Sequence, residues 1–192
     1  MTRVGARSAT LEVGCREIAP TMLPVDIALA AIKGTRFDLA VEKCTELGIR
    51  RLIPFISKRC VRRGSCDGSS PAIDRIRRKV IASCKQSGQP YFPDIDAPVR
   101  LDVLAERFCR YAAVYLAEQH VTMSASDVGD AGTGPVLGIV GPEGGLTPEE
   151  RDGLLARGAV PISLGASRLR SETAAICLAY RLLSGRSSAY EK

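Results

Sequence analysis

The sequence is poor in the residues on which several common kinds of protein chemistry depend. It has one histidine, His120, among 192 residues. A single histidine excludes a site built from several histidines and argues against a histidine-based catalytic triad. The seven cysteines include no Cys-x-x-Cys pair, so zinc-binding clusters are missing and we expect scattered, reduced thiols. The sequence therefore predicts a site that holds no metal.

Long apolar runs are also lacking. No run approaches the roughly 20 residues that a membrane-spanning helix needs. Residues 1–20 carry basic side chains without the apolar core of a secretory signal. Hydrophobic residues make up 45% of the chain and charged residues 25%, which is ordinary for a globular protein. We expect a cytoplasmic protein with one main core and no membrane partner.

Positive charge is concentrated in one stretch of the chain. Residues 33–100 contain 15 Lys or Arg and 7 Asp or Glu, a net charge of +8, whereas the whole chain carries +6. A polyanionic partner suits this concentration, because each cation that meets a phosphate releases counterions. A solvated helix face would explain residues 71–87 equally well. The loop run SKRCVRR favours nucleic acid, and its candidate RNA-binding residues are Lys58, Arg59, Arg62 and Arg63.

Strand-like and helix-like hydrophobic patterns alternate along the chain. We expect strands at 25–31, 52–56, 111–116, 136–140 and 160–164, helices at 35–47, 71–87, 101–108, 148–157 and 171–183, and irregular segments at 65–70, 89–98 and 120–134. Thr147, Pro148 and Glu150 predict a capping box at the start of the fourth helix. This alternation predicts an α/β fold, with a mostly parallel sheet and helices on both faces.

Three loops follow expected strands near the C-terminus, where the ligands of parallel sheets bind. The first carries Ala117 and Glu118, the second is GPEGGL at 141–146, and the third is 165–170. Glycines after a strand let a ligand approach the backbone, and a following helix offers free N–H groups. The spacing matches neither G-x-G-x-x-G nor a Walker loop. Glu143 favours a ligand with hydrogen-bond donors or positive charge, although a tight structural turn would give the same glycines.

The longer strings around these loops resemble a known family. GPEGGLTPEE followed by LGASRLRSETA is similar to the paired C-terminal motifs of the RsmE-type methyltransferases, and KGTRFDLAVEKCTELGIRRLIPFISKRCV and SCKQSGQPYFP resemble earlier family segments. The resemblance covers residues 25–184. It implies the SPOUT fold with a C-terminal deep trefoil knot, a homodimer, and methylation of uridine N3 in small-subunit (16S) ribosomal RNA during ribosome biogenesis. The cofactor it implies is S-adenosyl-L-methionine.

The resemblance also implies roles for individual residues. Matching cofactor-binding positions are Leu116, Glu118, Gly141, Glu143, Gly144, Gly145, Leu164, Gly165, Leu169, Arg170 and Thr173. Transfer of a methyl group to N3 requires that the imide lose its proton. Arg170 would stabilise the developing anion. Glu143 or Glu172 could accept the proton, and the base stays unassigned, because Glu172 can equally well complement the helix dipole.

Two departures from the family pattern bear on these expectations. The third loop usually reads LG-x-R-[IV]-L-R, but Ser167 stands at the usual arginine position and Arg168 replaces an aliphatic residue. Family members also begin with a PUA-like β-barrel. We therefore expect 1–24 to be a leader or a remnant of that barrel, and 25–192 to be the SPOUT methyltransferase domain. Two alternatives remain: a non-catalytic RNA-binding or ribosome-assembly factor of the same fold, and a methyltransferase acting on another RNA.

Overall fold

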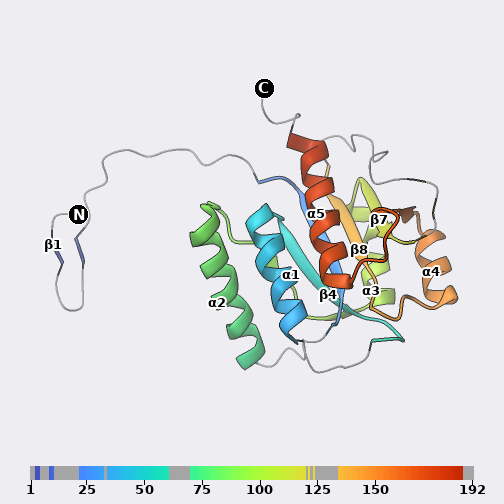
Figure 1. The fold of residues 1–192 in the computed structure, drawn as a ribbon, viewed down its shortest axis with the longest axis horizontal. Coiled ribbons are helices and arrows are strands. Elements are labelled where there is room, and N and C mark those ends of the chain that lie inside the picture. Colours follow the sequence, from blue (N-terminus) through green and yellow to red (C-terminus); the bar gives the residue numbers. More distant parts are fainter. Residues whose placement is uncertain are drawn as a thin grey trace.

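The computed structural model describes residues 3–4, 9–10, 22–32, 34–60, 70–119, 121, 123 and 134–187. Its centre is a seven-stranded sheet in the order β5-β4-β3-β8-β7-β9, with β6 also paired to β4 (Figure 1). The strands are β3 (Val25–Ala30), β4 (Arg51–Ile56), β5 (Asp94–Ile95), β6 (Val99–Arg100), β7 (Ala113–Ala117), β8 (Val136–Val140) and β9 (Val160–Ile162). All their pairings are parallel. Near the N-terminus, β1 (Arg3–Val4) pairs antiparallel with β2 (Ala9–Thr10).

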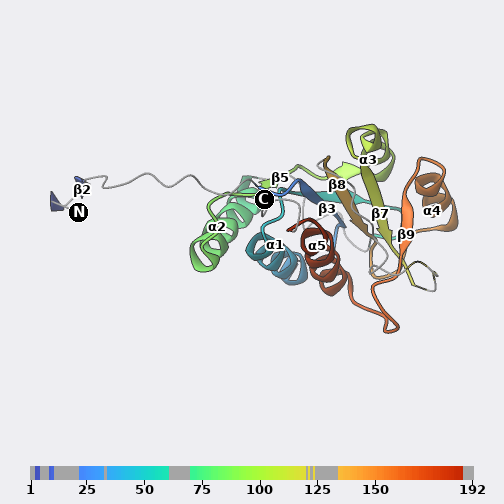
Figure 2. The ribbon, with the colours of Figure 1, turned by 90° about the horizontal axis from the view of Figure 1, so that it is seen from above.

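Helices cover both faces of this sheet. They are α1 (Gly34–Leu47), α2 (Ser70–Ser87), α3 (Leu101–Glu106), α4 (Pro148–Leu155) and α5 (Ser171–Ser187), with a short 3-10 helix, η1 (Phe108–Arg110), after α3. Figure 2 shows α1, α2 and α5 on one face and α3 and α4 on the other. The predicted fold class, a mostly parallel sheet between two helical layers, is confirmed. No helix in the described ranges is long and apolar enough to cross a membrane.

The central strands are buried on both faces because their side chains alternate between two cores. In β3, Ile27 and Leu29 pack in the core that α1, α2 and α5 cover, whereas Ala28 and Ala30 pack in the core under α3 and α4. All five residues of β8 are buried, as its unalternated apolar sequence predicts. The strand that carries the second candidate loop, β8, is therefore packed between both cores.

Gly138, in the middle of β8, lets α5 pack close against the sheet. A Cβ at this position would lie 2.7 Å from Leu178 Cδ2 and 3.0 Å from Ile27 Cδ1. A glycine inside a strand often marks such a close approach. At the start of α5, the Ser171 hydroxyl donates a 2.9 Å hydrogen bond to the Gly141 carbonyl oxygen, just after β8. Close packing of α5 thus fixes its N-terminus beside the glycine loop.

Most predicted elements appear, with shifted ends. The capping box of α4 is confirmed, since Glu150 Oε2 accepts from the Thr147 N–H at 2.9 Å and Thr147 Oγ1 accepts from the Glu150 N–H. The helix expected over 101–108 ends at Glu106 and gives way to η1. The segment 89–98, expected to be irregular, contains β5. Of the predicted loop at 65–70, only Ser70 is described, and it is the first residue of α2; most of 120–134 also lies outside the described residues.

The strand expected to begin at Tyr111 begins instead at Ala113, and Tyr111 binds a buried carboxylate. Its hydroxyl donates a 2.7 Å hydrogen bond to the carboxylate of Asp26, which is 1% exposed. Arg50 binds the same carboxylate through two hydrogen bonds, of 2.7 and 2.8 Å. A buried carboxylate needs such partners. This cluster joins the amino ends of the central strands, at the edge of the sheet opposite the candidate loops.

Candidate active site

The three predicted loops meet in one cleft. They follow β7, β8 and β9, and β7 lies between the other two, so their carboxyl ends come together at one edge of the sheet. The cleft has a volume of about 330 Å³. Its lining residues are Leu116–Gln119 and Val121 from the first loop, Val140–Glu143, Gly145, Leu146 and Arg151 from the second loop and α4, and Leu164, Gly165, Ser167–Leu169, Ser171 and Ala174 from the third loop and α5.

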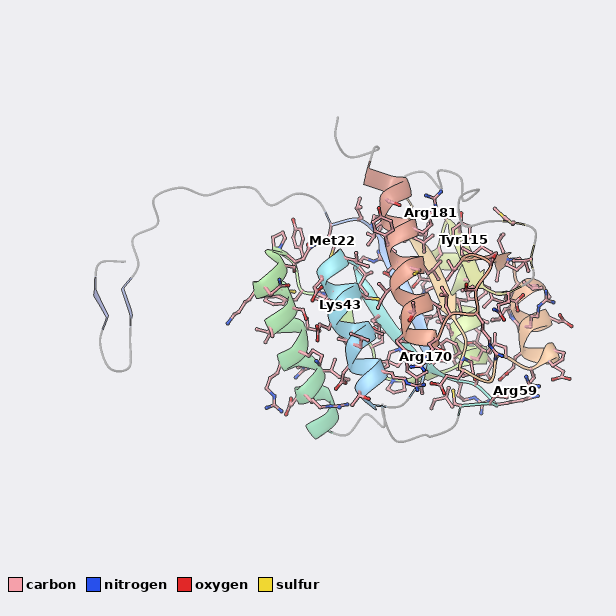
Figure 3. All side chains as sticks on the ribbon, in the orientation of Figure 1. Met22, Lys43, Arg59, Tyr115, Arg170 and Arg181 are labelled. Carbon is pink, nitrogen blue, oxygen red and sulfur yellow. The ribbon has the colours of Figure 1, made fainter. Side chains whose placement is uncertain are left out.

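Most residues predicted to bind the cofactor line this cleft. They are Leu116, Glu118, Gly141, Glu143, Gly145, Leu164, Gly165 and Leu169. Three predicted positions are not among its lining residues. Gly144 is exposed in the turn of the second loop, Arg170 is exposed just before α5, and Thr173 is exposed on α5. Figure 3 shows Arg170 at the lower end of α5, on the same edge of the molecule as Arg59.

The second loop depends on glycine at one position above all. Gly145 has φ of +70°, a left-handed conformation that residues with a Cβ adopt at a cost, and its N–H donates a 2.8 Å hydrogen bond to the Pro142 carbonyl oxygen. By contrast, a Cβ at Gly144 would make only an ordinary 3.7 Å contact with Arg59. The GPEGG segment is therefore a tight turn, and the turn brings its own backbone to the wall of the cleft.

Arginines hold the second loop from several sides. Arg59, on the loop after β4, donates to the carbonyl oxygens of Gly144 at 3.1 Å and Leu146 at 3.3 Å. Arg168 donates a 3.2 Å hydrogen bond to the Glu143 carbonyl oxygen. Arg168 is one of the two residues that depart from the family pattern, and its side chain contacts the second loop. The loop conformation is thus fixed by side chains from two other segments.

The three residues predicted to be catalytic lie in different environments. Glu143 lines the cleft, and its half-exposed carboxylate forms an ion pair with Arg36, at the start of α1. Glu172 is 5% exposed and is not among the lining residues. Its Oε1 lies 3.8 Å from Arg36 Nε, so the same guanidinium serves both carboxylates. Arg170 is exposed at the end of the third loop, two residues before Glu172.

Glu118 and Arg151 form a second charged feature of the cleft. Arg151 Nε donates to both carboxylate oxygens of Glu118, at 3.0 and 2.8 Å. The hydrogen bond to Glu118 raises the pKa of the Arg151 guanidinium. Glu118 is thereby fixed as an acceptor at the end of β7. Arg151 was not predicted, because it stands in α4 and no local motif marks it; Arg36 was missed for the same reason.

The residues predicted to bind RNA are only partly described. Lys58 and Arg59 lie on the loop after β4, next to the start of α4, where the Lys58 N–H donates a 2.7 Å hydrogen bond to Glu150 Oε1. The Lys58 side chain is 66% exposed, and its ammonium nitrogen lies 3.9 Å from Glu149 Oε2. Arg62 and Arg63 lie outside the described residues, as does His120. Within the described chain, no group of three or more His, Cys, Asp or Glu residues is arranged to hold a metal ion.

A parallel α/β domain with a cleft formed by glycine-containing loops at adjacent strand ends defines a class of ligand-binding enzyme folds. Comparison with known families places the chain within one of them. Residues 19–183 match the model of the RNA methyltransferase domain family. The chain belongs to this family.

Curated relatives agree with this assignment. The chain is 32% identical over 164 residues to "Ribosomal RNA small subunit methyltransferase E" of Mycobacterium tuberculosis (strain CDC 1551 / Oshkosh), covering 82% of this chain and 62% of the relative. It is 29% identical over 181 residues to the protein of that name from Aquifex aeolicus (strain VF5), covering 90% and 76%. The chain thus spans less than two thirds of the length of the mycobacterial relative.

Solved structures share the fold. A putative methyltransferase from Legionella pneumophila, solved in complex with the bound cofactor SAM, superposes with a TM-score of 0.76 at 28% identity, covering 88% of this chain and 67% of that one. A probable rRNA-methyltransferase from Porphyromonas gingivalis gives a TM-score of 0.77 at 26% identity, covering 90% and 72%.

Proposed function

We propose that this protein is an S-adenosylmethionine-dependent methyltransferase that modifies N3 of a uridine in small-subunit (16S) ribosomal RNA. The observation that carries the proposal is the single cleft formed by the loops after β7, β8 and β9 in a chain of the RNA methyltransferase domain family. Relatives of similar sequence are named small-subunit ribosomal RNA methyltransferases. The N3 position rests on the motif resemblance described above.

The cleft suits S-adenosylmethionine in size and chemistry. Its volume of about 330 Å³ falls within the roughly 300–1,000 Å³ typical of small-molecule sites. Leu116, Leu146 and Leu164 supply apolar wall for a flat ring. Glu118, held by Arg151, supplies an acceptor for hydroxyl groups, and backbone of the turn at Gly145 supplies further polar atoms. Glu118 and Glu143 also place two carboxylates in the cleft lining, beside the guanidinium groups of Arg151 and Arg168.

The methyl donor supplies an electrophilic methyl group, and the chain must position uracil N3 in line with it, about 3–3.5 Å away. We assign Arg170 to stabilise the negative charge that develops on the uracil ring, because it is exposed beside the third loop. A carboxylate such as Glu143 or Glu172 would accept the N3 proton. Glu143 lines the cleft and Glu172 does not, so Glu143 is the candidate that lies closer to a bound donor.

The RNA itself requires a wider surface. Lys58 and Arg59 follow β4 beside the second loop, and with Arg62 and Arg63 they would hold phosphates around a uridine that has left its stack. A homodimer, which the motif resemblance implies, would bring a second subunit to each active site. Further expectations are a deep C-terminal trefoil knot, residues 1–24 as the leader or remnant of a PUA-like barrel, and a place in the cytoplasm with the ribosomal subunits.

The experiment that tests this proposal separates donor binding from methyl transfer. Titration calorimetry with S-adenosylmethionine should give binding by the wild-type chain and by Arg170→Ala within several-fold of each other. The rate at which a labelled methyl group is transferred to small ribosomal subunits should fall by roughly 100-fold or more in Arg170→Ala, because an electrostatic contact to the reacting group is removed. Binding of the donor without any transfer by the wild type would favour the non-catalytic alternative.

Arg110→Ala is the matched control for this experiment. Arg110 is an exposed arginine in η1, just before the amino end of β7 and so at the edge of the sheet away from the cleft. Its loss removes the same positive charge from the surface, so both variants should change non-specific attraction to RNA equally. Equal transfer rates in Arg170→Ala and Arg110→Ala would remove Arg170 from the mechanism.

A further inference from the structure

Arg36 is the point at which three segments of the chain meet. It lies in the first turn of α1, where its guanidinium forms an ion pair with Glu143 of the second loop. The Nε of the same group lies 3.8 Å from Glu172 Oε1, in the first turn of α5. Arg36 itself is not among the residues that line the cleft. It therefore links the second loop to the start of α5 from a position outside the cleft lining.

The burial of Glu172 makes its contact with Arg36 important for stability. Its side chain is 7% exposed, and its Oε2 is buried without a hydrogen-bond partner among the described residues. A buried carboxylate is costly unless a cation or several donors compensate it. The 3.8 Å separation from Arg36 Nε is an ion pair but exceeds hydrogen-bond length. In the described structure, Arg36 is the cation that faces this carboxylate, with help from the N-terminus of α5.

The second loop and the segment leading into α5 are also linked directly to each other. The Ser171 hydroxyl donates to the Gly141 carbonyl oxygen at 2.9 Å, and Arg168 donates to the Glu143 carbonyl oxygen at 3.2 Å. These bonds hold backbone, whereas Arg36 holds the two carboxylates. A change at Arg36 thus acts on the second loop and on the start of α5 at the same time.

We propose that Arg36 is a positioning residue for the methyl-donor site, and this inference rests on the function proposed above. By neutralising buried Glu172 and binding Glu143, Arg36 keeps the second and third loops at the separation that the donor requires. Because Arg36 does not line the cleft, its loss should weaken donor binding more than it slows transfer at saturating donor. Arg36→Gln should raise the dissociation constant for S-adenosylmethionine by about tenfold or more, since it leaves a buried carboxylate without its cation.

Arg75→Gln provides the matched control. Arg75 in α2 also binds a carboxylate of α1, Asp38, at 2.9 Å, and its exposure is similar to that of Arg36. This pair lies between α1 and α2, and neither residue lines the cleft. The experiment measures the donor dissociation constant by calorimetry and the rate of methyl transfer for Arg36→Gln, Arg36→Lys and Arg75→Gln. We expect Arg75→Gln to bind the donor like the wild type, and Arg36→Lys to recover part of the affinity because it keeps the charge.

A second substitution tests the coupling to Glu172. If Arg36 acts by neutralising Glu172, Glu172→Gln should cost little further affinity, or restore some, in the Arg36→Gln background, because the uncompensated charge is then gone. Equal donor affinity in Arg36→Gln and Arg75→Gln, with a wild type that binds, would overturn the positioning role alone. A folded wild type that binds no S-adenosylmethionine would overturn the proposed function and the positioning role with it.

Discussion

Gly145 offers the sharpest test of how the second loop works. Its φ of +70° places the backbone in the left-handed region, where an alanine costs about 1–2 kcal/mol. Apart from the adjoining residues, no atom of the described chain lies within 4 Å of the position that a Cβ would take, so this cost is conformational. Gly144 has no positive φ, and a Cβ there would make only an ordinary contact at 3.7 Å with Arg59. The neighbouring glycine is therefore a control in the same loop.

Two measurements follow from these numbers. In a domain of this size, about 1–2 kcal/mol corresponds to a fall of about 2–8 °C in the melting temperature of Gly145→Ala. If the loop relaxes to relieve the strain, binding of S-adenosylmethionine must return it to the strained conformation. That same cost of about 1–2 kcal/mol is then lost from the binding free energy, which weakens binding by about 5- to 30-fold. Gly144→Ala should stay within about 0.5 kcal/mol in stability and about twofold in affinity. The assays are thermal denaturation and titration calorimetry.

The reasoning would be refuted by a Gly145→Ala variant that matches Gly144→Ala in both measurements. It would also be refuted by a Gly144→Ala variant with the larger loss of donor affinity, since that would locate the need for glycine at a close approach of the ligand and not in the backbone conformation of the turn.

Two further predictions concern stability. Gly138→Ala should lower the free energy of unfolding by about 1–3 kcal/mol in urea denaturation, because its Cβ would lie 2.7 Å from Leu178; an unchanged midpoint would contradict the close packing of α5. Burial raises the pKa of the Cys44 thiol from 9.0 to about 12, and burial together with Asp26 raises the pKa of Tyr111 above its usual 10.0. The unfolded chain loses these protons at a lower pH than the folded chain does. The free energy of unfolding should therefore fall as the pH rises above about 9. Tyr111→Phe should show a shallower fall between pH 8 and 10.5, and an identical slope would refute this contribution.

Much of the fold could be predicted because its signals are local. Apolar runs identified the strands, and glycines such as Gly48 at φ +87° ended the helices where expected. The capping box at Thr147 likewise depends on residues close in the sequence. The two-residue strands β5 and β6 carry no such signal, because they are short and lie in or next to a segment rich in proline. They are strands because they pair with β4. Their pairing with a distant strand, and not the strand propensity of their own residues, determines their conformation.

The site divides in the same way. The loops after the strands were predicted, because parallel strand ends meet at one edge and because glycines and charges stand out there. Arg36 and Arg151 were not predicted. Each lies inside a helix and reaches a carboxylate of another element, Arg36 at Glu143 and Arg151 at Glu118. Such pairings depend on how helices dock on the sheet, which no spacing in the sequence encodes. The burial of Glu172 away from the cleft lining was missed for this reason too.

The most direct test of the central claim is to identify the methylated nucleoside. Small ribosomal subunits that lack the modification would be incubated with the full chain and S-adenosylmethionine carrying a deuterated methyl group, and their nucleosides would be analysed by mass spectrometry. The account predicts the label on N3 of uridine, and its loss with Arg170→Ala. Label on a ribose hydroxyl or on another base, or no label although the donor binds, would contradict it.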